Sequence, residues 1–328
     1  MTIEIKTAML EPVRHTFAHI ERRFGDKPAT RYQEATYDVA SERNFHYKPL
    51  WQPEYELNDV TRTAIVMQDW YAFKDPRQFY YGSYVQARAK QQEVAESNYS
   101  FFEKRDLARL IPEAIQQKVI RLLVPLRHVE QAANLNNMYG NSFASGTAIS
   151  QALLFNGMDR LGNAQYLSRI GLILDGNSGD ALVEAKGFWM SDAVWQGMRA
   201  YCEANICVKD WFESFVAQDV VLDGLIYELV YLQFDQWLAD NGGQDFSMLT
   251  EFIQNWNKET NRWVDAVVKI AAAESTANQQ HLELWITAWK EKALKALQPL
   301  AQEMIDDQAL NVAEGALLKR LNKAGLFQ

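Results

Sequence analysis

Apolar residues recur at helical spacing along most of this chain. Ile115, Val119 and Leu122 follow one another at intervals of four and three positions within a segment from about 111 to 136. This period places the three side chains on one face of an α-helix. Pro125 lies inside the same segment and predicts a kink there, because proline removes a backbone hydrogen bond of the helix.

The same spacing predicts helices over most of the chain after about residue 60. Asp75-Pro76-Arg77-Gln78 is typical of a helix start, with Asp75 as the cap, Pro76 in the first turn and Gln78 completing a capping-box-like pair. The glycine-rich clusters at 175–179 and 241–243 each end a helix. The further predicted helices span about 75–102, 145–173, 179–186, 191–204, 210–239, 246–273 and 277–306, followed by a short terminal helix.

The first sixty residues have a different pattern. Pro12, Pro28, Pro49 and Pro53 interrupt any long helix there. Six aromatic residues are scattered among charges without a regular period: Tyr32, Tyr37, Phe45, Tyr47, Trp51 and Tyr55. Disordered segments are poor in such rings. We therefore expect residues 1–60 to form an extended N-terminal arm that lies on a partner subunit, and residues 61–328 to form the helical domain.

Composition supports the all-α prediction and narrows the classes of partner. The 328 residues include only 16 glycines and 8 prolines, which favours helices over a sandwich or barrel. A formal charge of −9 repels phosphate backbones, so we expect no nucleic-acid partner. No apolar run predicts a membrane span and no signal peptide is visible. Cys202 and Cys207 are expected as small buried side chains in a reducing cytoplasm.

Three stretches of the sequence resemble a known family. Residues 75–81 read DPRQFYY and are followed by Tyr84-Val85, residues 24–34 read FGDKPATRYQE, and residues 126–131 read LRHVEQ. In these stretches the chain is similar to the bacterial multicomponent monooxygenase hydroxylases. Over most of its length it resembles the β subunits of that family, those of phenol hydroxylase in particular. Toluene and soluble methane monooxygenases have related subunits.

This resemblance implies a fold, partners and cofactors. It implies a ferritin-like helical bundle within an (αβγ)2 assembly in which only the α subunit holds a di-iron centre. It also implies that electrons pass from NADH through a reductase that carries FAD and a 2Fe-2S cluster, and that a small coupling protein regulates turnover. The implied reaction is the hydroxylation of phenol or another aromatic ring with O2.

The iron-binding pattern of such bundles is missing from this chain. The pattern has a Glu on one helix and Glu-x-x-His on the next, followed by a repeat of both. The five histidines are His15, His19, His46, His128 and His281, and the residues three positions before them are Pro12, Thr16, Arg43, Pro125 and Asn278. Pro125 and His128 are therefore interpreted as a degenerate Glu-x-x-His, and we expect neither a catalytic residue nor a metal ligand in this chain.

The remaining candidate residues have plainer interpretations. His128 is alone on an apolar helix face and is expected to be a core residue with hydrogen-bonded ring nitrogens. Asp219 and Asp223 lie one helical turn apart with no histidine near them in sequence. A salt-bridged or partner-facing pair is therefore expected. No glycine-rich phosphate loop is present.

Together these observations predict a non-catalytic structural β subunit that docks on an iron-bearing α subunit through a long helical face and the N-terminal arm. The residues expected at this contact are Arg31, Tyr32, Tyr37, Phe45, Tyr47 and Trp51. Three alternatives stay open. The chain could be the β subunit of a toluene/o-xylene-type monooxygenase, a stand-alone degenerate di-iron oxidase, or a helical scaffold for a small hydrophobic ligand.

Overall fold

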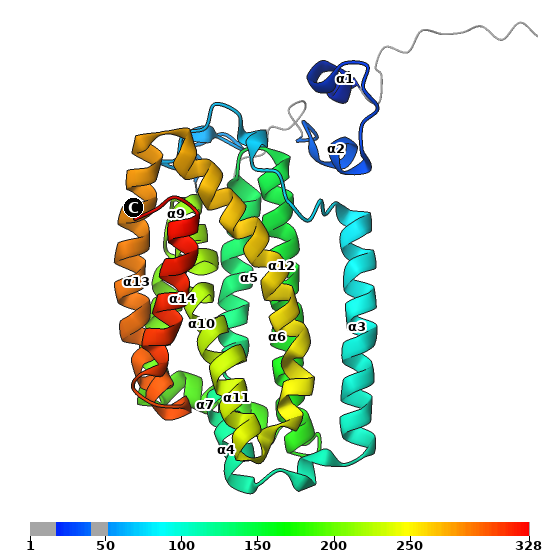
Figure 1. The fold of residues 1–328 in the computed structure, drawn as a ribbon, viewed down its shortest axis with the longest axis vertical. Helices are drawn as coiled ribbons and strands as arrows, with labels where there is room; N and C mark the ends of the chain where they lie inside the picture. Colours follow the sequence, from blue (N-terminus) through cyan, green and yellow to red (C-terminus); the bar gives the residue numbers. More distant parts are fainter. Residues whose placement is uncertain (1–17, 41–51, 328) are drawn as a thin grey trace, which may run out of the picture.

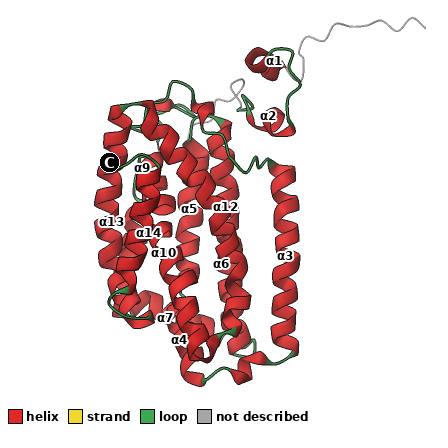
Figure 2. Ribbon diagram, in the orientation of Figure 1, coloured by secondary structure: helices red, strands yellow, loops and turns green. Residues whose placement is uncertain are grey.

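Long helices run side by side in one bundle (Figure 1). The computed structural model of the chain describes residues 18–40 and 52–327. Within these two ranges the chain forms helices and loops but no strand (Figure 2), so the all-α prediction is confirmed. The long helices are α3 (Tyr81–Lys104), α5 (Leu126–Phe143), α6 (Thr147–Leu174), α12 (Asp245–Glu274) and α13 (Thr276–Met304).

Shorter helices complete the bundle, and side-chain caps fix several of their starts. Thr30 and Gln33 form a capping box at the start of α2, and the Asp210 carboxylate accepts the backbone N–H groups of Phe212 and Glu213. Such caps satisfy the N–H groups that the first turn leaves free. The shorter elements are α1 (Ala18–Phe24), α2 (Arg31–Thr36), η1 (Val60–Arg62), η2 (Trp70–Ala72), η3 (Leu107–Leu110), α4 (Glu113–Leu122), α7 (Asp180–Ser191), α8 (Ala193–Ile206) and α14 (Ala309–Lys323).

A helical run from residue 211 to 243, largely buried as far as Tyr231, occupies the middle of the bundle. Trp211 and Phe212 at its start and Phe234 further along are fully buried. The run ends where Gly242 adopts a φ of 89°, a conformation that favours glycine. It consists of α9 (Trp211–Phe215), α10 (Asp223–Glu228) and α11 (Asp235–Leu238), alternating with the π-helical segments η4 (Val216–Leu222), η5 (Leu229–Phe234) and η6 (Ala239–Gly243).

The helix predicted to start at Asp75 begins later, so that prediction is wrong. Residues 75–78 form a turn, because the Asp75 carboxylate accepts the backbone N–H of Arg77 and pairs with its guanidinium at 2.9 Å. Gln78 has a φ of 53°, in the left-handed region that a helix cannot contain. α3 starts at Tyr81, where the Ser83 hydroxyl accepts the backbone N–H of Tyr80.

Pro125 separates two helices where a single kinked helix was predicted. α4 ends at Leu122, and α5 starts at Leu126 and continues to Phe143. Leu126 and His128 donate their backbone N–H groups to carbonyls three residues back, at 3.1 and 3.0 Å. This tighter pattern bridges the position at which proline has no N–H to donate.

The described part of the N-terminal arm packs on its own chain. The Tyr32 hydroxyl accepts the backbone N–H of Asp75 at 2.8 Å, and the Tyr37 ring stacks on Tyr71 with centroids 5.2 Å apart. Both tyrosines are buried, whereas Arg31 is exposed. Tyr32 and Tyr37 therefore pack within the chain, and their expected place at a subunit contact stays a prediction. The other residues expected there, Phe45, Tyr47 and Trp51, lie outside the described ranges.

Candidate functional site, a buried ion cluster

Ten polar side chains meet in the bundle interior, and each is at most 6% exposed. We call them the ion cluster. α5 contributes Glu130, Asn136 and Asn137, α6 contributes Asn156, Arg160 and Asn163, and the buried run contributes Gln218, Asp219, Asp223 and Tyr227. The three members on α6 are four and three residues apart, so they share the helix face that points into the bundle.

Arg160 is the cation of the ion cluster. Its Nη1 atom donates to the Tyr227 hydroxyl at 2.6 Å and lies 3.3 Å from the Glu130 carboxylate. Its Nη2 atom pairs with the Asp223 carboxylate and lies 3.7 Å from Asp219. One guanidinium therefore joins carboxylates from two other helices. Asp219 and Asp223 were expected to be salt-bridged or partner-facing, and the structure shows both carboxylates beside Arg160.

Side-chain amides donate further hydrogen bonds to two of the carboxylates. Asn137 and Asn156 donate to the same Asp219 oxygen at 3.1 and 2.7 Å, and Gln218 donates to Asp223 at 3.0 Å. Buried charges are stable only when such partners replace the lost water. The amides therefore offset part of the cost of burying these charges inside an apolar bundle.

The charges in the ion cluster do not balance if every carboxylate is ionised, because three acids face one arginine. Burial, followed by the nearby Asp223, raises the pKa of Asp219 to about 7. Burial also raises the pKa of Glu130 and of Asp223 above their ordinary values. Burial opposes the charged form of Arg160, but Asp223 and the other acids hold its pKa well above the usual value. The cluster therefore favours a charged guanidinium beside carboxylates that readily take up protons.

The donor set does not fit a di-iron centre. Glu130 and Arg160 are thirty residues apart on adjacent helices, and Asn163 follows Arg160 by three. In a di-iron bundle the last two positions belong to Glu-x-x-His. A guanidinium has only N–H donors and cannot bind a metal. Within the described residues, no group of three or more His, Cys, Asp and Glu side chains is arranged to hold a metal ion.

Pro125 and His128 lie elsewhere in the fold. His128 is two positions before Glu130 and so points about 200° away from it around the helix axis. Its ring stacks on Trp189 with centroids 5.4 Å apart, and its Nε2 atom has no hydrogen-bond partner in the described structure, contrary to the expected hydrogen-bonded ring. Burial, followed by the charges of Arg127 and Lys186, lowers its pKa to about 4.

A second ion pair holds α3 against the bundle. Arg88 on α3 pairs with Asp159 on α6 and with Glu259 on α12, both at 2.7 Å, and the Tyr84 hydroxyl donates to Asp159 at 2.8 Å. Arg88 and Asp159 are both buried. These contacts tie three long helices together at one level of the bundle.

The family described as methane/phenol/alkene hydroxylase matches residues 51–275 of this chain. The chain belongs to this hydroxylase family. Among its relatives, the phenol 2-monooxygenase oxygenase component DmpL of Pseudomonas sp. (strain CF600) is 51% identical over 99% of this chain and 98% of the relative. The corresponding component MhpL of Acinetobacter pittii (strain PHEA-2) is 53% identical over 99% and 98%. The beta subunit of the toluene-4-monooxygenase hydroxylase of Ectopseudomonas mendocina is 23% identical over 84% and 88%.

Solved hydroxylase structures share the fold. A chain of xenon-pressurised phenol hydroxylase from Pseudomonas sp. OX1 superimposes with a TM-score of 0.92 at 52% identity, covering 98% of both chains. A chain of toluene 4-monooxygenase gives a TM-score of 0.79 at 22% identity, covering 90% of this chain and 98% of the other, which bears on the fold alone. The predicted family resemblance and the ferritin-like bundle are confirmed. No helix in the described ranges is both apolar enough and long enough to span a membrane.

Proposed function

We propose that this chain is the non-catalytic β subunit of the oxygenase component of a multicomponent monooxygenase that hydroxylates phenol with O2. The observation that carries the proposal is the position of Arg160, whose guanidinium lies among Glu130, Asp219 and Asp223 in the bundle interior. A cationic side chain there neutralises the acids that a metal would otherwise need, so this chain keeps the bundle without the metal.

The named relatives support the choice of reaction. Two relatives that are 51% and 53% identical are oxygenase components of phenol 2-monooxygenases. The relative of a toluene monooxygenase is 23% identical and is a beta subunit. The higher identity favours a phenol monooxygenase over a toluene/o-xylene-type enzyme, and the toluene relative supports the subunit role.

In this proposal the redox groups lie in other chains. A di-iron centre is held by a partner α subunit, while NADH, FAD and a 2Fe-2S cluster belong to a partner reductase in the same cytoplasm. A γ subunit completes an (αβγ)2 assembly, and a small coupling protein controls turnover. This chain contributes a rigid neighbour, because metal ligands hold their geometry only when the surrounding helices do not move.

The outer face of α5 and α6 supports a subunit role. From residue 131 to 168 the only charged residues are Asp159 and Arg160, and both are buried. Over this stretch the exposed side of the helix pair therefore has no charge. It presents Leu135, Met158 and Leu161, which are 48%, 37% and 41% exposed. Free protein surfaces carry many charged side chains, whereas the core of a permanent interface is depleted of them.

Co-purification with metal analysis tests the proposal. The tagged full-length chain is expressed alone and together with the α, γ, coupling and reductase chains of a phenol monooxygenase system. We expect a larger Glu-x-x-His-containing chain to co-purify with the tagged chain. We expect iron and phenol hydroxylation only in the co-expressed material. Stoichiometric iron or O2 consumption by the chain alone would instead establish a stand-alone oxidase.

A surface variant tests the docking face separately. Leu135→Glu places a charge on the outer face of α5, and we expect it to prevent assembly with the α subunit because a buried unpaired charge opposes the interface. Val183→Glu on α7, a position that is 73% exposed, is the matched control and should assemble normally. Unchanged assembly of the Leu135→Glu variant, with a normal circular dichroism spectrum, would show that α5 and α6 do not form the contact.

A further inference from the structure

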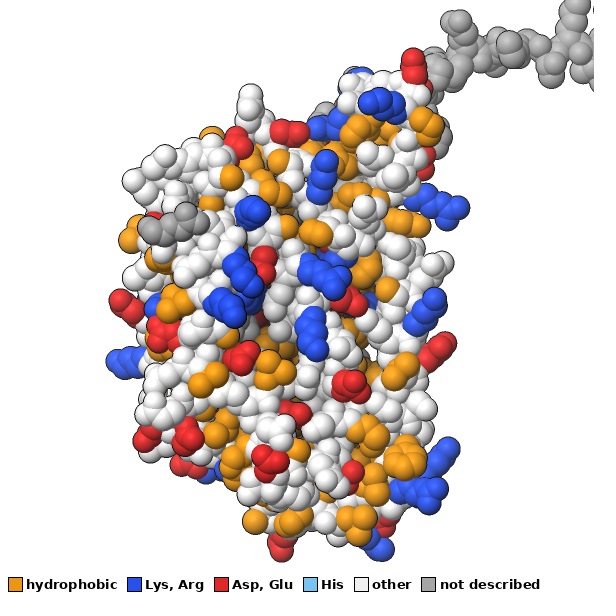
Figure 3. Space-filling model, in the orientation of Figure 1, with side chains coloured by type: hydrophobic (Ala, Val, Ile, Leu, Met, Phe, Trp, Pro, Cys, Tyr) orange, Lys and Arg blue, Asp and Glu red, His pale blue; other side chains and the backbone are white. Residues whose placement is uncertain are grey.

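A basic surface lies over α12 and α14. On α12, Lys258, Arg262 and Lys269 are exposed, and their spacing of four and seven residues places them in one stripe along the helix. On α14, Lys319 and Lys323 are exposed and one turn apart. We call these five residues the basic face. Figure 3 shows Lys and Arg side chains gathered over these two helices.

The charges of the basic face are not neutralised by ion pairs among the described residues. None of its five cations forms an ion pair within the part of the chain that the structure describes. Asp265, one of the acids between its two stripes, is already paired with Arg320 at 2.7 Å. The chain carries a formal charge of −9, so this concentration of unpaired positive charge opposes the overall charge. Such a patch attracts and orients acidic partners.

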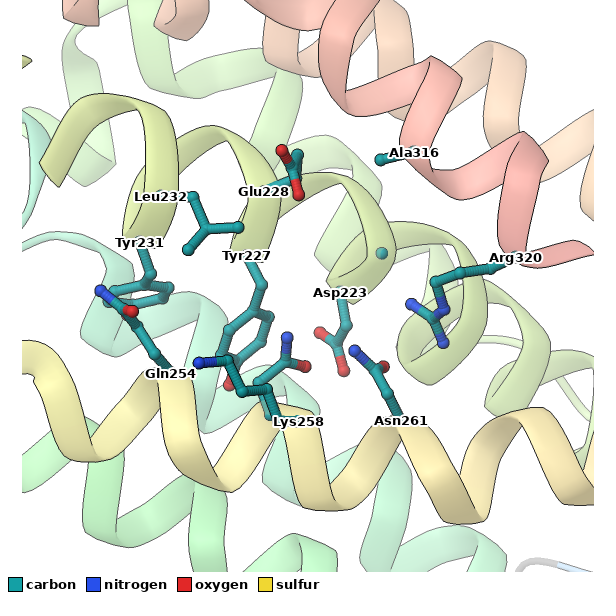
Figure 4. Close-up of a pocket in the computed structure, with 12 residues that line it drawn as sticks. Asp223, Tyr227, Glu228, Tyr231, Leu232, Gln254, Lys258, Asn261, Ala316 and Arg320 are labelled. Atoms are coloured by element: carbon teal, nitrogen blue, oxygen red, sulfur yellow. The ribbon is translucent and has the colours of Figure 1, made fainter. Parts of the chain in front are cut away.

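A pocket of about 150 Å³ opens between the stripes. Figure 4 shows Lys258 and Asn261 reaching in from α12 toward Tyr227 and Asp223 on α10, with Arg320 entering from α14. The pocket wall also carries carboxylates, those of Asp223 and Glu228. A small anion inside the pocket meets these acids, whereas a broad surface resting on the rim meets the lysines. The arrangement therefore favours an extended acidic partner over a free anion.

We propose that the basic face docks the acidic surface of another protein. From Lys258 to Lys269 the stripe on α12 extends over about 16 Å at 1.5 Å per residue, which matches a row of carboxylates along about three turns of a partner helix. Phosphate backbones fit less well, because the rest of this acidic chain repels a long polyanion. Exposed charge pairs of this kind mainly raise the association rate and make it sensitive to salt. The contact is therefore a transient one.

Peptide binding tests the proposal on the full-length chain. The probe is a fluorescent 20-residue helical peptide rich in Glu, titrated while fluorescence anisotropy is recorded. We expect Lys319→Glu/Lys323→Glu and Lys258→Glu/Arg262→Glu each to weaken binding about tenfold or more. We expect Lys90→Glu/Lys104→Glu, which reverses two exposed, unpaired lysines on α3, to bind as the unaltered chain does. Raising the salt from about 50 to about 300 mM should remove binding.

A carbodiimide, which joins carboxylates to lysine amines, locates the contact. We expect mass spectrometry to find peptide cross-links at Lys258, Lys269, Lys319 and Lys323. Equal loss of binding in the α3 control, or cross-links spread evenly over the chain, would overturn the proposal. A single-stranded oligonucleotide of the same charge that binds more tightly than the peptide would overturn it in favour of a nucleic-acid site. The proposal is independent of the proposed function, so the iron content of the chain does not bear on it.

Discussion

Removing the guanidinium of Arg160 should destabilise the chain more than removing any exposed arginine. Arg160→Met keeps a similar volume and leaves Glu130, Asp219 and Asp223 without a cation in a buried site. Breaking a buried ion pair from one side costs about 3–5 kcal/mol. With an unfolding entropy of about 2.1 cal/mol/K per residue, the midpoint of thermal unfolding of this 328-residue chain should fall by about 4–7 °C.

The matched control is Arg169→Met on the same helix. The Arg169 side chain is 28% exposed and pairs with Glu96, which is 46% exposed. A pair of this kind contributes at most about 1 kcal/mol, so the control midpoint should fall by less than about 2 °C. Scanning calorimetry at pH 7.5 measures both variants. Equal shifts for Arg160→Met and Arg169→Met would refute the role given to Arg160 in the ion cluster.

Three further predictions test other contacts. The folded-state pKa of Asp219 is raised from 3.8 to about 7, so its contribution to the free energy of unfolding falls as pH rises from about 4 to about 7, by up to about 1.4 kcal/mol per pH unit. Calorimetry should therefore show that the Asp219→Asn variant becomes more stable relative to the unaltered chain as pH rises. The opposite trend would contradict the raised pKa. Gly197→Ala should lower the free energy of unfolding by about 1–3 kcal/mol, because the new Cβ lies 3.0 Å from the Cα of Ala296. Gly187→Ala, whose new Cβ meets nothing within 4 Å, should raise it by up to about 1 kcal/mol. Equal denaturation midpoints for the two variants would contradict this. Arg88→Met should speed hydrogen exchange along α3, because it leaves the buried Asp159 without a cation, whereas Lys90→Met should not. Identical exchange in both variants would show that the Arg88 pair does not hold α3.

The fold could be predicted from the sequence wherever helical periodicity meets a clear stop. The helices predicted at about 145–173, 246–273 and 277–306 are close to α6, α12 and α13. The prediction failed where one local interaction overrides the pattern. The pairing of Asp75 with Arg77 turns an apparent helix cap into a turn, and that contact cannot be read from spacing alone.

Only part of the ion cluster could be predicted from the sequence. Asp219 and Asp223 stand out because they interrupt an apolar run, but their partner Arg160 lies 59 and 63 residues away and becomes a neighbour only when α6 packs on the run. A search that starts from histidines leads to His128, which faces away from the cluster. The sequence signal that points to the cluster is the spacing of thirty residues between Glu130 and Arg160, which lie on two predicted neighbouring helices.

Anomalous diffraction tests the central claim, that Arg160 and not a metal ion is the cation inside this bundle. Crystals of the assembled hydroxylase are measured on both sides of the iron absorption edge. The account predicts iron peaks in a companion chain and no peak within bonding distance of Glu130, Asp219 or Asp223. An iron peak bound by these three carboxylates, with the Arg160 side chain displaced from them, would contradict it.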